Sequence, residues 1–148
     1  MLSKTPLPVW QAAPLIGVVV FVINLVIARV MASVLNAPAT FAPLTPMPVL
    51  GASLGGVLLA SGVYFWMMRS LPKPLPAIYA VSGVVLLLSF ILPIRLFRTS
   101  PPPQPRFQGI TVPIAATMIL MHTLVAAGSL VAFRLWHDNR GAGEQSVG

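Results

Sequence analysis

The 148-residue sequence lacks cysteine and has only two acidic residues and two histidines. The absence of cysteine excludes disulfide bonds, thiolate metal sites, iron–sulfur clusters and cysteine nucleophiles. Both acids, Asp138 and Glu144, lie in the C-terminal region. With so few candidates, no serine–histidine–acid set, pair of catalytic carboxylates or metal-ligand spacing can be assembled. We therefore expect that the chain is not an enzyme and that it binds neither a metal ion nor another cofactor.

Charged residues are also scarce: they make up 7% of the chain, whereas hydrophobic residues make up 57%. A soluble domain typically has about one-quarter charged residues, so this composition indicates a protein of the lipid bilayer. The formal net charge is nevertheless +7, because the chain has nine lysines and arginines. Most of them flank apolar runs, where basic side chains anchor helix ends and meet anionic lipid headgroups. We expect these lipids, and not nucleic acid, to be the partners of the basic residues.

Four apolar segments are long enough to cross a membrane. A helix needs about 20 residues to span the roughly 30 Å hydrocarbon core, because it rises about 1.5 Å per residue. Such segments occupy approximately residues 10–35, 49–68, 77–94 and 111–133. The third is expected to end at Pro93, and the polar stretch 138–148 is expected to be a disordered tail. The sequence thus predicts an all-α integral membrane protein, in which residues 1–148 form a single four-transmembrane-helix bundle.

The distribution of basic residues predicts the orientation of the bundle. With four spans, the two termini and the link between the second and third spans share one side. That side holds Lys4, Arg69, Lys73, Arg134 and Arg140, and the other holds Arg95, Arg98 and Arg106, together with Arg29 if its side chain snorkels that way. The positive-inside rule therefore places both termini in the cytoplasm. An alternative is cleavage of a signal peptide after Ala39, but the apolar core at 12–28 is longer than the roughly 7–15 residues of such peptides.

The second apolar segment carries small residues one helical turn apart. Gly51 and Gly55 form a GxxxG pair, which lies beside an offset stripe of Ala52, Gly56 and Ala60. Such residues let the backbone of a neighbouring helix approach closely, so we expect this segment to pack through them. The motif leaves open whether the neighbouring helix belongs to the same chain or to another protomer of a homo-oligomer.

The first apolar segment contains two residues that are unusual in a membrane helix. Asn24 shares a face with Ala13, Gly17 and Ala28, which predicts that it points into the bundle and hydrogen-bonds to another helix. Arg29 falls on a different face, and the chain offers no acid near it. Its guanidinium therefore snorkels to the interface, binds a lipid phosphate or points into a wet cavity.

His122 lies in the middle of the fourth apolar segment, on a face that it shares with Ala115, Ala126 and Ser129. This small-residue face predicts that the imidazole points into the bundle. Three roles are open: a hydrogen-bonding residue of the helix packing, a proton relay and a haem ligand. A bis-histidine haem within one chain is excluded, because His137 lies at or beyond the membrane interface.

Three stretches of sequence carry a family resemblance: NLVIAR at 24–29, VVLLLSF at 84–90 followed by Pro93, and ILMHTLVAA at 119–127. Together they resemble a bacterial family of small four-span membrane proteins called domain of unknown function 6069. The resemblance implies a four-helix architecture in the inner (plasma) membrane and draws attention to Asn24, Arg29, Ser89 and His122. It implies no activity. The proline-rich basic link at 95–109 is longer than in the family pattern.

These features support more than one function. The leading hypothesis is a non-enzymatic, multi-pass structural or accessory subunit, whose helix faces pack against a membrane partner protein or a second copy. The alternative is a small transporter or proton-coupled carrier that uses His122 and Arg29. A further alternative is a haem-binding membrane protein.

Overall fold

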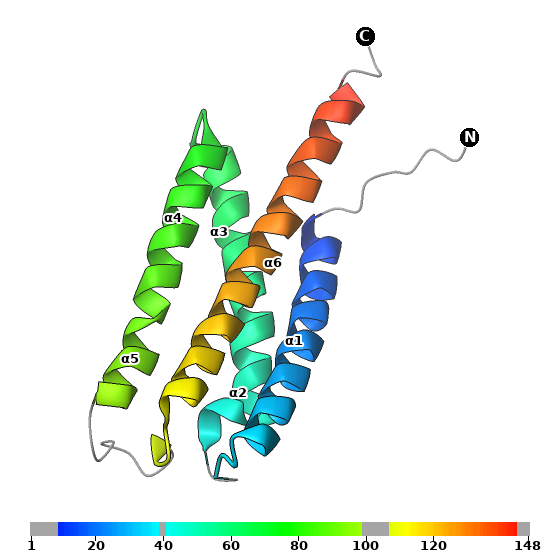
Figure 1. The fold of residues 1–148 in the computed structure, drawn as a ribbon. Helices are drawn as coiled ribbons and strands as arrows, with labels where there is room; N and C mark the ends of the chain where they lie inside the picture. The colour runs from blue at the N-terminus through cyan, green and yellow to red at the C-terminus, as the bar shows by residue number, and fades with distance from the viewer. Residues whose placement is uncertain (1–8, 39–40, 99–106, 145–148) are drawn as a thin grey trace.

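A computed structural model of the chain describes residues 9–38, 41–98 and 107–144. Within these ranges every regular element is helical and there is no strand (Figure 1). The elements are α1 (Val9–Val34), the 3-10 turn η1 (Ala42–Leu44), α2 (Pro46–Leu50), the π-helical turn η2 (Gly51–Gly55), α3 (Gly56–Ser70), α4 (Pro74–Ser89), α5 (Ile91–Arg98) and α6 (Val112–Glu144).

These elements make four helices that are long and apolar enough to cross a membrane: Ala12–Val34, Pro46–Ser70, Pro74–Leu96 and Val112–Arg134. The second consists of α2, η2 and α3 in succession, and the third joins α4 to α5. At about 1.5 Å per residue, the shortest of these helices, of 23 residues, exceeds the thickness of the hydrocarbon core. The expected all-α, four-transmembrane-helix bundle is therefore confirmed.

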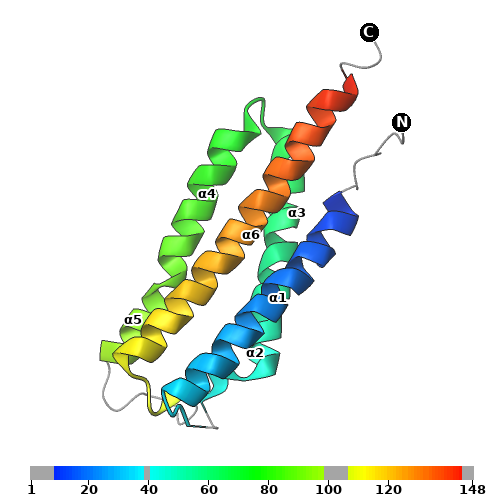
Figure 2. The same ribbon diagram turned by 45° about the vertical axis from the view of Figure 1, so that its right-hand side comes forward.

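The beginning of α1, the turn between α3 and α4, and the end of α6 lie together at one end of the bundle (Figures 1 and 2). We call this the terminal end. The end of α1, the beginning of α2, the end of α5 and the beginning of α6 lie at the other end, which we call the loop end. Helices α1, α3 and α6 pack together, and α4 stands at the edge of the bundle beside α6.

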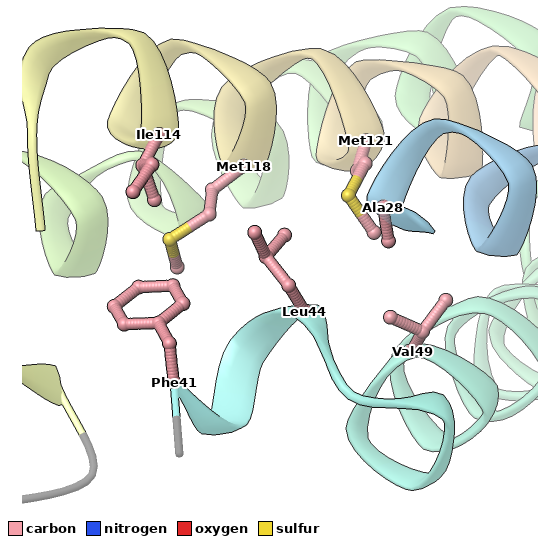
Figure 3. Packing of buried hydrophobic residues seen from close by; sticks show 7 residues of the cluster. All are labelled: Ala28, Phe41, Leu44, Val49, Ile114, Met118 and Met121. Carbon is pink, nitrogen blue, oxygen red and sulfur yellow. The ribbon is translucent and has the colours of Figure 1, made fainter. Parts of the chain in front are cut away.

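Two apolar clusters hold the helices together. At the loop end, η1 turns Phe41 and Leu44 toward Ile114 and Met118 of α6, and Ala28, Val49 and Met121 complete the cluster (Figure 3). At the terminal end, Tyr64 of α3 stacks on Phe133 of α6, with ring centroids 4.5 Å apart. Ile78 of α4 belongs to this second cluster, which therefore attaches α4 to the rest of the bundle.

The third span does not end at Pro93, and this part of the sequence-based expectation is wrong. Proline has no N–H to donate to the carbonyl of Ser89 four residues earlier, and its ring crowds the preceding turn. The helix is therefore interrupted at Phe90 and then resumes as α5 as far as Arg98. Pro93 itself is buried, so the interruption lies in the packed part of the structure.

The fourth span, Val112–Arg134, agrees with the expected 111–133, but its helix does not end there, because α6 runs on to Glu144. The prediction of a disordered tail is thus wrong for residues 138–144, and residues 145–148 lie outside the described ranges. Opposite charges four positions apart in the sequence, at Arg134 and Asp138 and at Arg140 and Glu144, favour a helix in water. The α6 helix therefore has a sequence suited to continuing beyond the apolar span.

Candidate functional site: a groove between α3, α4 and α6

A groove of about 700 Å³ runs between α3 and α4, with α6 and Asn24 of α1 on its inner side. This volume is within the range of pockets that bind small molecules. We call this feature the interhelical groove. Its lining residues are Asn24, Ala42, Pro43, Pro48, Val49, Ala52, Ser53, Gly55, Gly56, Leu59, Ala60, Val63, Tyr64, Met67, Ile78, Val81, Ser82, Val85, Leu86, Ser89, Leu92, Phe107, Met118, Met121, His122, Val125, Ala126, Ser129 and Phe133.

The outer edges of the groove are apolar and exposed. Leu59 on α3 is 73% exposed and Val85 on α4 is 59% exposed, and both lie within the membrane-spanning helices. In a bilayer these edges face hydrocarbon. The inner side differs, because Asn24, Ser53 and Ser129 are polar and buried there. The groove thus joins the lipid phase to a set of polar groups inside the bundle.

Asn24 is 1% exposed and connects three helical elements. Its side-chain nitrogen donates to the Ser53 hydroxyl of η2 across 2.9 Å and to the Met121 carbonyl of α6 across 3.4 Å. A backbone carbonyl can only accept, so this second bond fixes which end of the amide faces α6. The Asn24 oxygen, Oδ1, is buried and accepts no hydrogen bond in the described part of the chain. It is an acceptor that needs a donor.

His122 has one ring nitrogen committed to its own helix. Nδ1 lies 2.6 Å from the carbonyl oxygen of Met118, and because that oxygen only accepts, Nδ1 carries the hydrogen. In the neutral ring, Nε2 is then an acceptor. His122 is also one of the residues that line the interhelical groove.

The hydroxyls of two groove serines are also committed to backbone carbonyls. Ser89 donates to Leu86 across 2.7 Å, and Ser129 donates to Val125 across 2.8 Å. Both are local bonds within a helical turn, which serine commonly makes in membrane helices. The hydrogens of these two hydroxyls are therefore used within their own helices.

The depth of the site follows from the lengths of the spans. Asn24 is adjacent to Ile23, the middle residue of Ala12–Val34, and His122 is adjacent to Thr123, the middle residue of Val112–Arg134. Both acceptors thus lie near the centre of the hydrocarbon core, where polar groups are expensive to bury and are retained for packing or function.

The π-helical turn η2 places Ser53 opposite Asn24. Ser53 is buried in the middle of this turn, between Gly51 and Gly55. Single π turns within longer helices are rare and occur frequently at functional sites. The sequence analysis missed Ser53, and the nearest signal was its position inside the glycine pair.

The structure brings Asn24, Ser89 and His122 to the same groove but separates Arg29 from them. Arg29 is exposed on α1 and does not line the groove. The prediction that Asn24 points into the bundle together with Ala13, Gly17 and Ala28 is confirmed, because all of them are buried. Among the described residues, no group of three or more histidines and acids is placed to hold a metal ion.

The predicted helix contacts of the small residues hold only in part. A Cβ built at Gly51 or Gly55 would meet nothing within 4 Å, so these glycines make no close helix contact within the described chain, and their packing against another protomer stays a prediction. Gly56 does pack, since its Cβ would lie 2.9 Å from Val125 of α6, and Ala60 lies against the terminal-end cluster. The sequence pattern could not tell which side of the segment faces the bundle.

Two other glycines also lie at close helix approaches. A Cβ at Gly17 would lie 2.7 Å from the Leu54 side chain and 3.6 Å from its Cα. A Cβ at Gly128 would lie 2.6 Å from Val20. The sequence pattern places Gly17 on the bundle-facing side of the first span. It did not mark Gly128 as a packing residue, although Gly128 follows Ala126 and Ala127 in the sequence.

The fold and the groove define a multi-pass membrane-protein architecture of four apolar helices with a lateral groove that has a few polar residues on its inner side. Comparison of the chain with protein-family models, with curated proteins and with solved structures finds no match. The resemblance to domain of unknown function 6069 therefore stays a prediction.

Proposed function

We propose that this chain is a non-enzymatic, multi-pass membrane protein that binds a lipophilic small molecule in the interhelical groove. The observation that carries the proposal is the combination of a cavity of about 700 Å³ with exposed apolar edges and a few polar groups on its inner side. Ligand sites are typically concave and mostly apolar, with a small number of placed polar groups. A ligand dissolved in the bilayer would enter past Leu59 and Val85, without crossing water.

The lining of the groove supports binding more than acid–base chemistry. Among the described residues that line the groove, His122 and Tyr64 have ionisable side chains, and none is acidic. Proton relays in membranes are usually chains of acids and histidines. The carrier hypothesis pairs His122 with Arg29, and the placement of Arg29 outside the groove gives that pairing no support.

A second candidate function is the accessory subunit, and one observation favours it. Gly51 and Gly55 leave open space on the surface of the second span, and a backbone can approach such a surface closely. A transmembrane helix of a partner protein or of a second copy would fit against it. In this case the chain would be recovered from membranes as a stable assembly.

The cellular setting is also part of the proposal. Arg69 and Lys73 lie at the terminal end, and Arg95 and Arg98 lie in the last turn of α5 at the loop end. Lys4 and Arg106, which also entered the charge comparison, lie outside the described residues. We propose a bacterial inner membrane with the terminal end in the cytoplasm, where anionic lipid headgroups contact the basic residues.

Purification in a mild detergent tests the proposed function. Organic extraction of the pure chain, followed by mass spectrometry, should yield a lipophile in stoichiometric amount. A Soret band in the absorption spectrum would instead identify haem as the ligand. Copurification of a membrane protein, with no extracted lipophile, would support the accessory subunit and contradict the proposed ligand.

A further inference from the structure

We propose that the occupant of the interhelical groove is a lipid with a single long hydrocarbon chain and an anionic headgroup. The chain lies along the groove through both leaflets, and the headgroup lies at the loop end beside Arg95 of α5. This inference rests on the proposed function and names the class of the ligand. A polyprenyl phosphate has this chemistry, since it joins a single isoprenoid chain to a phosphate.

The length of the groove indicates a chain that crosses the middle of the membrane. Met118 and Phe133 both line the groove, and α6 rises by about 22 Å between them at about 1.5 Å per residue. Half of the roughly 30 Å hydrocarbon core is about 15 Å, so each chain of an ordinary bilayer phospholipid ends near the midplane. The groove continues past that depth into the other leaflet. A chain that fills it must therefore be longer than one leaflet is thick.

The width of the groove limits how many chains it can hold. Spread along about 22 Å, the volume of about 700 Å³ gives a mean cross-section of about 30 Å². An α-helix with its side chains is about 10–12 Å across, so its cross-section is about 80 Å² or more. The groove is therefore too narrow for a transmembrane helix of a partner protein, whereas a single extended hydrocarbon chain is narrow enough to lie in it.

The two ends of the groove differ in their burial. At the terminal end the lining is formed by buried side chains, among them Met67 and the stacked rings of Tyr64 and Phe133, none more than 5% exposed. At the loop end the lining includes Pro48 and Leu92, which are both exposed. The groove is thus closed at the terminal end and open at the loop end. The tip of the chain therefore lies at the terminal end, and the headgroup emerges at the loop end.

The charges at the loop end indicate an anionic headgroup. No charged side chain lines the groove among the described residues, so a charged headgroup must lie outside it. Arg95 follows Leu92 by three positions on α5, and residues at this spacing are neighbours on the surface of a helix. Both are exposed, and Arg98 lies one turn further along. Guanidinium groups bind phosphate through charge-assisted hydrogen bonds, so a phosphate headgroup complements this end of the groove.

Binding of two probes to the purified full chain in an uncharged detergent tests the headgroup. Geranylgeranyl phosphate and geranylgeraniol share the chain, but only the first is anionic, and we expect it to bind more tightly. Arg95→Gln should weaken the binding of the phosphate about two- to fivefold, as expected for one solvent-exposed ion pair, and leave the binding of the alcohol unchanged. Arg69→Gln is the matched control, because Arg69 is likewise exposed in the last turn of its helix but lies at the terminal end.

Photolabelling of the parent chain tests the course of the hydrocarbon chain and needs no variant. A diazirine at the far end of geranylgeranyl phosphate should label Tyr64, Met67 or Phe133 at the terminal end. A diazirine next to the phosphate should label α5 near Leu92. An excess of unlabelled geranylgeranyl phosphate should abolish both reactions, because the site is saturable.

The outcomes separate this inference from the proposed function. Binding of the phosphate that is unchanged in Arg95→Gln, or weakened equally in Arg69→Gln, would overturn the inference, as would far-end labelling at the middle or the loop end of the groove. If organic extraction yields a diacyl phospholipid or a compact lipophile and neither probe binds saturably, the inference falls and the proposed function stands. The absence of both an extracted lipophile and saturable binding would overturn both.

Discussion

The Asn24 side-chain nitrogen lies 2.9 Å from the Ser53 hydroxyl oxygen, and this bond joins α1 to η2 near the middle of the bundle. Both residues are buried, so neither can exchange its partner for water. The same amide nitrogen reaches the Met121 carbonyl of α6. A single side chain thus links the first, second and fourth spans.

The link between Asn24 and Ser53 should be measurable as a coupling energy. In a double-mutant cycle of Asn24→Leu and Ser53→Ala, we expect about 0.5–1.5 kcal/mol of coupling in the free energy of unfolding, as for other interhelical hydrogen bonds in membranes. The measurement is reversible unfolding in detergent or bicelles. Ser61→Ala is the matched control, since the Ser61 hydroxyl donates to Val57 in its own helix. Coupling of similar size between Asn24 and Ser61 would contradict the assignment.

Substitution of glycines by leucine should distinguish helix surfaces that pack against another helix from surfaces that face open space. Gly128→Leu and Gly56→Leu should lower the melting temperature in detergent, because a branched side chain would collide with Val20 and Val125, respectively. Gly51→Leu and Gly55→Leu should preserve it, since open space surrounds both positions within the described chain. Loss of an oligomer in Gly51→Leu, with the fold retained, would instead identify that surface as a contact between protomers.

His122 should contribute little to folding stability through its ring. Its hydrogen bond goes to the Met118 carbonyl, which is also the acceptor for the backbone N–H four residues later in a regular α-helix. Removing the ring therefore leaves that carbonyl with a partner. We expect the free energies of unfolding of His122→Gln and His122→Leu to differ by no more than about 0.5 kcal/mol. A much less stable His122→Leu would show that the ring holds a contact essential to packing.

Reporter fusions should establish the orientation. A reporter active only in the cytoplasm should work when fused after Gly148 or inserted between α3 and α4. A reporter active only in the periplasm should work in the link between α5 and α6. The reverse pattern would contradict the assignment, as would a mature N-terminus that begins at Thr40.

The sequence alone was sufficient to predict the membrane spans and the burial of Asn24. Span length follows from the thickness of the bilayer, and the 3.6-residue period alone places Asn24 with Ala13 and Ala28. The small-residue pattern was less informative, because a membrane helix is apolar on every side and its bundle face is not marked by hydrophobicity. The same pattern therefore included Gly55, which faces open space, and Gly56, which packs on α6.

The groove itself could not be predicted from the sequence. It depends on the position of α4, which Ile78 attaches at the terminal end and which is interrupted near the loop end, at Phe90. Proline in position 93 indicated a disruption, but it did not reveal whether the helix would stop or resume. The hydrogen bonds on the inner side of the groove likewise depend on distances between helices, such as that from Asn24 to Met121.

The most direct test of the central claim is native mass spectrometry of three forms of the chain released from detergent: the parent, Gly55→Phe and Gly62→Phe. Both glycines have open space around them, but only Gly55 lines the interhelical groove. We predict one bound lipophile on the parent and on Gly62→Phe, and none on Gly55→Phe. Equal retention of a lipophile by all three forms, or its absence from the parent, would contradict the proposal that the groove binds a ligand.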